Sequence, residues 1–297
     1  MRDGLDARRL RVVDAAGIAT RVYEAGDGPP LLLVHGGDFG SLYSLDGWSL
    51  NLERLAQRFH VVAFDKLGQG HTANPESDEA YSYERLLRHA LAVAEVVLSE
   101  PAHVVGHSMG ALLAESIALA VPELVRTLVL VDSNTAAPDD AHYPRGAFYR
   151  DLERRLGDAP PTTETVRLEP DLQSVSRAHV TDDFVERLLA ITTGAAYADA
   201  HGRMERLRHT QWFPSLDAER GHVLSTTAAY GLPAPALVVW GARDPSAPLP
   251  LAYALFEHVA RSTRGCELHV LGDVGHYSFR EAPRAFERIV GAFCLDR

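Results

Sequence analysis

The sequence has few cysteines and no long apolar run. Its only cysteines are Cys266 and Cys294, which have neither metal-ligand spacing nor a partner cluster, so we expect two free thiols rather than a disulfide framework or a zinc site. No stretch approaches the roughly 20 apolar residues that a membrane-spanning helix requires. We therefore expect no membrane association, and no motif indicates a metal or a cofactor.

Basic residues are also in deficit. The 29 Lys and Arg residues against 40 Asp and Glu residues give a formal net charge of −11, which argues against nucleic acid and anionic membrane surfaces as partners. The first residues, Met-Arg-Asp-Gly-Leu-Asp, are charged and include no apolar segment of a secretory signal, so a cytoplasmic protein is expected. A hydrophobic content of 46% and a length of 297 residues fit one large α/β domain with an insertion, or two ordinary domains.

Apolar runs and helical patterns alternate through the first half of the chain. An opening hairpin is predicted over 10–23, and buried strands over 31–34, 61–65, 102–105 and 127–132. Helices are predicted over 48–59, over 82–99 and directly after residue 110. This alternation predicts a mostly parallel sheet with right-handed crossovers and helices on both faces.

The alternation stops between about 134 and 226 and then resumes. In that stretch the patterns are helical, over 148–156, 182–191 and 195–207, and we interpret it as a helical cap inserted between two core segments, 1–133 and 227–297. The second core segment carries predicted strands over 236–241 and 267–271, a helix over 249–260, and a last helix containing Phe286 and Phe293.

The stretch around which the chain is organised is Gly106-His107-Ser108-Met109-Gly110, between a predicted strand and a predicted helix. In that context Gly-x-Ser-x-Gly forms a nucleophile elbow, a turn so sharp that its serine is strained and exposed at the end of the strand. The flanking glycines let neighbouring backbone approach without a Cβ clash. The Met109 N–H at the start of the helix can then point at a developing oxyanion.

A serine hydroxyl needs a base, and the base needs an acid to hold its tautomer. Asp244 follows the predicted strand 236–241, and His276 follows the predicted strand 267–271, so both stand at strand ends in the order Ser…Asp…His. The second oxyanion donor is expected from the loop His35-Gly36-Gly37, through the Gly37 N–H. Taken together, the sequence predicts a catalytic triad of Ser108, Asp244 and His276.

Each of these residues also has a structural interpretation. Asp244 could be part of an ordinary turn or a helix N-cap, and His276 is one of 14 histidines, most of which are structural or solvated. Gly36-Gly37 could be only a tight turn, and His35 is expected to support the oxyanion loop. Four elements in the required order, each at a strand end, favour the catalytic interpretation.

By these motifs the sequence resembles the α/β-hydrolase superfamily over nearly its whole length. Within it, the sequence is most similar to hydrolases of meta-cleavage products in His35-Gly36-Gly37, in the loop to Gly47-Trp48-Ser49, in 64–70 and in Ser108-Met109-Gly110. The resemblance implies an eight-stranded, mostly parallel sheet flanked by helices, a helical lid, a buried pocket and, in that subfamily, cleavage of a C–C bond in a dienone acid after ketonisation. It implies no cofactor.

The sequence departs from that subfamily at His107, where asparagine is usual, at Tyr277, where tryptophan is usual, and at Leu50, where asparagine is usual. Arg187 is the nearest candidate for a substrate-carboxylate ligand, although its position favours an exposed helix arginine paired with Asp183. The candidate substrate-binding residues are Gly36, Asp38, His107, Arg187, Trp212 and Tyr277, and His71 is a further candidate pocket residue.

The leading hypothesis is a cofactor-free serine hydrolase acting on a small, mostly apolar carbonyl compound, by C–C cleavage or as a carboxylesterase or lactonase. An epoxide hydrolase or dehalogenase is disfavoured because both need a carboxylate where Ser108 stands. A different class, a non-hydrolytic lyase, cyclase or ligand-binding member of the fold, also fits the sequence. A small molecule is the expected partner, and a homodimer is expected only by analogy.

Overall fold

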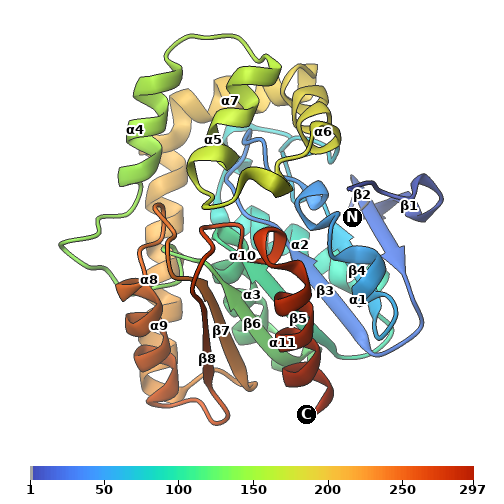
Figure 1. Cartoon of the computed structure of the whole chain (residues 1–297), viewed down its shortest axis with the longest axis vertical. Coiled ribbons are helices and arrows are strands. Elements are labelled where there is room, and N and C mark those ends of the chain that lie inside the picture. Colours follow the sequence, from blue (N-terminus) through green and yellow to red (C-terminus); the bar gives the residue numbers. More distant parts are fainter. Residues whose placement is uncertain (1–2) are drawn as a thin grey trace.

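The computed structural model describes residues 3–297, and its centre is one eight-stranded sheet with strand order β1-β2-β4-β3-β5-β6-β7-β8. The first hairpin pairs antiparallel to the rest, and all pairs from β4 through β3 to β8 are parallel. The α/β-hydrolase fold expected from the sequence is therefore confirmed. Figure 1 shows helices on both sides of this sheet and a group of helices at one end of it.

The strands lie where the apolar runs predict them. Their bounds are β1 Leu10–Ala15, β2 Ile18–Ala25, β3 Pro30–Val34, β4 His60–Phe64, β5 Ala102–His107, β6 Val125–Val131, β7 Ala236–Gly241 and β8 Glu267–Leu271. Every residue of β3, β5 and β7 is buried, because helices cover both faces of these central strands.

The core helices are α1 Leu52–Leu55, α2 Tyr83–Val97, α3 Met109–Ala120, α9 Pro250–Ala260, α10 Ser278–Glu281 and α11 Pro283–Leu295. One apolar cluster joins α2, α3 and α9 to one face of the sheet, and a second joins α1 and α11 to the other. The helix predicted over 48–59 is wrong in extent, since a 3₁₀ turn over Leu45–Trp48 precedes the four-residue α1.

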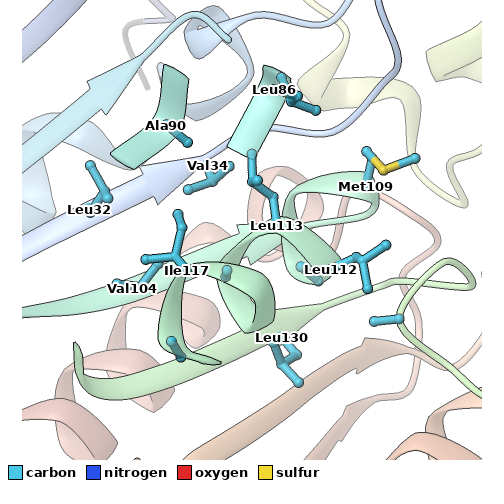
Figure 2. Packing of buried hydrophobic residues seen from close by; sticks show 14 of the residues in the cluster. Leu32, Val34, Leu86, Ala90, Val104, Met109, Leu112, Leu113, Ile117 and Leu130 are labelled. Atoms are coloured by element: carbon cyan, nitrogen blue, oxygen red, sulfur yellow. The ribbon is translucent and has the colours of Figure 1, made fainter. Parts of the chain in front are cut away.

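Helix α3, which follows the elbow, is buried nearly all round. Leu113 and Ile117 lie between the sheet residues Val34 and Val104 and the side chains of α2 (Figure 2). Because the interior is densely packed, a leucine-to-alanine change here would cost about 2–5 kcal/mol of unfolding free energy. This packing fixes the helix, and therefore the elbow at its N-terminus.

Between β6 and β7 the chain has helices only. They are α4 Ala147–Leu156, α5 Thr163–Leu172, α6 Asp182–Thr192, α7 Ala195–Leu207 and α8 Phe213–Tyr230. Helices α4 to α7 lie beyond one end of the sheet, whereas α8 runs back along the molecule and packs against α2, α3 and α9 (Figure 1). We call the segment 134–226 the cap, as defined from the sequence, and note that α8 extends four residues beyond it.

In the described residues, no helix is both long enough and apolar enough to cross a bilayer. Cys266 and Cys294 are unpaired, as predicted, and burial raises the pKa of each thiol to about 11.

Candidate active site

Ser108 stands at the turn between β5 and α3. Its backbone has φ 53° and ψ −122°, a region that non-glycine residues seldom occupy and that costs on the order of 1–3 kcal/mol. The surrounding structure holds this conformation, since the Ser108 N–H donates to the Val131 carbonyl at 2.8 Å and the Ser133 hydroxyl donates to the Ser108 carbonyl at 2.6 Å. The strain is that of a nucleophile elbow.

The two glycines of the motif are required by close approach of backbone. A Cβ added at Gly106 would lie 2.1 Å from the Gly110 carbonyl oxygen, and one added at Gly110 would lie 2.4 Å from the Val34 carbonyl oxygen. A side chain at either position would therefore force the turn apart, which is the role predicted for these glycines.

Asp244 and His276 are joined directly. The His276 Nδ1–H donates to Asp244 Oδ2 at 2.7 Å, and both side chains are buried. Because a carboxylate can only accept this bond, the proton is on Nδ1 and Nε2 is left as an acceptor. The other carboxylate oxygen of Asp244 accepts from the backbone of Ser246 and Ala247 and from the Ser246 hydroxyl, so the aspartate is fixed in a turn as well as paired.

The charge of Asp244 governs the titration of His276. Burial disfavours the imidazolium, but the adjacent carboxylate and its hydrogen bond outweigh burial, so the pKa of His276 is raised above its usual value. Nε2 is buried and has no hydrogen-bond partner in the described part of the chain, and the Ser108 hydroxyl makes no hydrogen bond to it here. Catalytic hydrogen bonds of this kind often form only when substrate is bound.

The expected oxyanion donors stand on the two sides of the serine. The Met109 N–H is in the first turn of α3, where helical N–H groups have no intrahelical acceptor, and Gly37 has φ +76°, at the end of the loop after β3. A Cβ at Gly36 would lie 3.0 Å from the Ser108 Cβ, so this loop passes directly beside the serine. Neither the Gly37 nor the Met109 N–H donates to another described backbone group.

The loop after β3 is supported from below by His35 and Lys66. His35 Nδ1–H donates to the Gly36 carbonyl at 2.8 Å and its Nε2 accepts from the Lys66 N–H at 3.0 Å, so the imidazole is neutral. Burial lowers the pKa of His35 well below its usual value. Lys66, the only lysine of the sequence, is fully buried and donates to the Gly37 carbonyl at 2.7 Å, and burial lowers its pKa to about 7. The structural interpretation of His35 therefore agrees with its contacts.

Two candidate pocket residues, His107 and Tyr277, pack around His276 and border only a small cavity. His107 Nε2 donates to the His276 carbonyl at 3.0 Å, and Tyr277 stacks on Tyr43 with ring centroids 6.2 Å apart. His107 and Tyr277 are 1% and 2% exposed and line a cavity of about 10 Å³, which has room for about one water molecule. Both side chains pack around the His276 loop.

Asp38 and Trp212 bind each other across the boundary between core and cap. The Trp212 Nε1–H donates to Asp38 Oδ2 at 3.0 Å, and the indole is fully buried against Phe39. Burial raises the pKa of Asp38 despite this bond. This pair ties the π-helical turn Arg208–Trp212 to the loop that carries Gly37.

The structure does not bring Arg187 to this site. Its guanidinium donates to the Asp3 carbonyl and carboxylate at 3.0 and 3.1 Å, and it forms an ion pair with Asp46 at 3.2 Å. The exposed pair with Asp183 is not formed either. The His71 side chain is exposed, so it does not line a buried pocket.

Gln173, which sequence reasoning missed, connects the cap to both catalytic candidates. Its backbone carbonyl accepts from the His276 N–H at 2.9 Å, and its side-chain amide donates to the Ser246 hydroxyl at 3.2 Å, next to Asp244. A Cβ at Gly275 would lie 2.1 Å from the same Gln173 carbonyl, so the glycine of Gly275-His276 is what permits this approach. No local pattern marks Gln173, because the residues that link it to the site, Ser246 and His276, are more than 70 positions away.

Asp132 is a second residue that sequence reasoning missed. It follows β6, has φ +47°, and its carboxylate accepts from the Gly241 N–H at 2.7 Å and the Ser278 N–H at 3.3 Å. It therefore links the ends of β6 and β7 to the segment after His276. Burial raises the pKa of Asp132 well above its usual value, and the nearby Asp244 charge adds to the rise. Its position at the end of a predicted strand could have marked Asp132 as a candidate site residue.

Comparison with known proteins identifies the class. The model of the alpha/beta hydrolase family matches residues 31–289, and the chain belongs to that family. Together with the strained serine and the Asp244–His276 pair, this makes the protein a hydrolase.

Individual relatives indicate which kind of hydrolase the chain resembles. The chain is 29% identical over 286 residues to 2-hydroxymuconate semialdehyde hydrolase of Pseudomonas sp. (strain CF600), covering 96% of this chain and 94% of the relative. It is 27% identical over 289 residues to 2-hydroxy-6-oxo-6-(2'-aminophenyl)hexa-2,4-dienoic acid hydrolase of Metapseudomonas resinovorans, covering 97% and 91%. Among solved structures, it matches a meta-cleavage product hydrolase from Pseudomonas fluorescens IP01 with a TM-score of 0.75 and 26% identity, covering 96% and 97%. The resemblance to C–C hydrolases is confirmed.

Proposed function

We propose that the protein is a cofactor-free serine hydrolase in which Ser108 is the nucleophile, His276 the general base and Asp244 the residue that orients the imidazole. The observation that carries the proposal is the 2.7 Å Asp244–His276 bond, which leaves an unpaired Nε2 at the end of the sheet where the strained Ser108 stands. A buried acceptor without a partner is costly, so its retention favours a functional role.

The chemistry follows from these positions. Ser108 Oγ attacks a carbonyl carbon while its proton passes to His276 Nε2, and the Gly37 and Met109 N–H groups stabilise the oxyanion. Collapse of the tetrahedral species expels the leaving group, which takes the proton from His276. Water, deprotonated by the same Nε2, then releases the acid and regenerates Ser108.

Two bond classes fit this mechanism, and the relatives favour one of them. The relatives named above are meta-cleavage product hydrolases, so C–C cleavage next to a ketone in a dienone is the first candidate. Ester or lactone hydrolysis is the second candidate, and it is favoured by Arg187, whose guanidinium is bound to Asp3 and Asp46 and is not available for a substrate carboxylate.

The test is turnover of p-nitrophenyl esters and of a yellow meta-cleavage dienone by the wild type, Ser108→Ala and the exposed control Ser99→Ala. We expect the first variant to lose at least about 10⁴-fold in kcat on whichever substrate the wild type accepts, and the control to match the wild type. Equal rates for wild type and Ser108→Ala would exclude Ser108 as the nucleophile. Bleaching of the dienone decides between the two bond classes.

A further inference from the structure

Glu169 is a buried acid that the proposed mechanism does not use. It lies on cap helix α5 and is only 7% exposed, and its Oε1 has no hydrogen-bond partner in the described residues. No ion pair of Glu169 is formed with any described basic residue. Leaving a buried carboxyl oxygen without a partner is costly, so such an acid beside the candidate active site is a candidate contact for a ligand.

Glu169 faces the same site as His276. It stands four residues before Gln173, on the same side of α5, and Gln173 bonds to the His276 N–H and to Ser246. Burial lowers the pKa of His276, and the charges of Asp244, Asp132 and, to a smaller extent, Glu169 raise it. The helix therefore presents its acid toward the catalytic candidates from the cap side.

The groups around Glu169 are mostly phenols. The titratable groups that sense its charge are Tyr43, Tyr149, Tyr197, Tyr277 and His276. The Tyr43 hydroxyl is already used as a donor to Gln173 Oε1 at 3.1 Å, and the Tyr277 hydroxyl is buried without a partner. The surroundings thus hold polar groups that can hydrogen-bond a ligand.

Three cations that could otherwise serve a substrate carboxylate are bound by other groups. Arg187 is held by Asp3 and Asp46, Arg280 donates to the Gly47 carbonyl at 2.9 Å and to Asp3 at 2.8 Å, and Lys66 donates to Gly37. A substrate carboxylate placed beside Glu169 would meet a like charge with no compensating cation. A substrate donor would meet the Glu169 Oε1, which has no hydrogen-bond partner in the described residues.

We infer that Glu169 is a specificity-determining residue that accepts a hydrogen bond from a hydroxyl or protonated amine on the substrate, away from the carbonyl that Ser108 attacks, and that it disfavours a carboxylate there. This inference rests on the proposed serine-hydrolase function. It makes the preferred substrate a neutral or cationic carbonyl compound with a polar donor, and it separates this protein from relatives named for dienoic acids.

The test uses p-nitrophenyl esters of six- and eight-carbon acids whose far end is a methyl, hydroxyl, ammonium or carboxylate group. We expect wild-type kcat/KM to be at least about tenfold higher for the hydroxyl or ammonium ester than for the methyl ester, and lowest for the carboxylate ester. Glu169→Gln should reduce that preference at least about tenfold while leaving the methyl ester within about threefold. Glu164→Gln, an exposed change on the same helix, should behave as wild type.

A pH series separates recognition from a structural role. Because burial raises the pKa of Glu169 to about 7, the preference for the ammonium over the methyl ester should grow between pH 6 and pH 8 in the wild type. Glu169→Gln should lose this growth, which a merely structural residue would not control.

The outcomes distinguish this inference from the proposed function. A wild type that hydrolyses the methyl ester through Ser108 but treats all four ends alike, or a Glu169→Gln variant that loses all four rates equally, overturns the role of Glu169 alone. A wild type whose ester turnover survives Ser108→Ala overturns the proposed function and, with it, this inference.

Discussion

The sheet and the cap supply different parts of the site. Ser108, Asp244 and His276 follow β5, β7 and β8, where the chain must turn at the end of a buried strand. Glu169 lies on α5 of the cap and Gln173 directly follows that helix, and both face the same site from the cap side. The sheet therefore positions the proposed reacting groups, whereas the cap supplies the groups proposed to orient them and to select the substrate.

Replacing the acid should have the largest effect on turnover after loss of the nucleophile. Asp244→Asn keeps the shape of the turn, but the asparagine amide would donate a hydrogen bond to His276 Nδ1 instead of accepting one. The imidazole proton would then be on Nε2, the wrong tautomer for a base, and we expect kcat to fall about 10⁴-fold. Steady-state kinetics on the best ester measures this. If Asp132→Asn lost about 10⁴-fold in kcat while Asp244→Asn remained active, Asp132 would be the acid instead.

Weakening the contacts between the cap and the His276 loop should reduce kcat less than Asp244→Asn does. Gln173→Ala removes the side-chain bonds to Ser246, Tyr43 and Tyr149 but keeps the backbone carbonyl that accepts from His276. We therefore expect kcat to fall about 10- to 100-fold from misplacement of the imidazole. The control is Gln211→Ala, a cap glutamine whose side chain donates to the carbonyl of the exposed Glu79. A kcat unchanged by Gln173→Ala would mean that the sheet alone positions His276.

The pH dependence of turnover tests the core pair by itself. General-base catalysis requires neutral His276, whose pKa is raised above the usual 6.5. The pH profile of kcat/KM should therefore have an acidic limb: below the pKa of His276, kcat/KM should fall tenfold per pH unit. In Asp244→Asn the carboxylate that raises this pKa is gone, and the limb should move to lower pH. A limb that stays in place in that variant would show that another group titrates.

The smallest effect on turnover is expected at a buried acid outside the site. Glu115 of α3 is 2% exposed with Oε2 unpartnered, and burial raises its pKa to about 8 against the opposing charge of Arg220. The folded state therefore binds the proton more tightly than the unfolded state, and this contribution to stability is lost as pH rises from about 4.5 to about 8.

Glu115→Gln should consequently raise the unfolding free energy at pH 8 by about 1–3 kcal/mol and leave kcat nearly unchanged. Urea unfolding at pH 5 and pH 8 measures the difference, with the exposed Glu123→Gln as control. A variant that is less stable than the wild type at pH 8 would contradict this explanation.

The fold was predictable where short-range pattern decides structure. The apolar runs of β3, β4, β5 and β7 read directly as strands because both faces are buried, and Gly-x-Ser-x-Gly predicted the turn at Ser108. Helix α5 was missed because Pro170 lies inside it, where a proline normally ends a helix.

The parts of the site that were not predictable depend on distant partners. Arg187 carries no local sign that Asp3 and Asp46 will bind it, since those residues lie more than 100 positions away in the sequence. Glu169 and Gln173 look like ordinary helix residues until the end of α5 is placed beside the His276 loop. The cap's contribution to the site therefore had to come from the structure.

Covalent labelling by a fluorophosphonate, followed by intact mass and peptide mapping, reports directly on whether Ser108 is activated. We predict one adduct per chain, on Ser108, formed at least about 100-fold more slowly in His276→Ala than in the wild type. An unlabelled wild type, or an adduct on another residue at the same rate in both proteins, would contradict an activated serine at the end of β5.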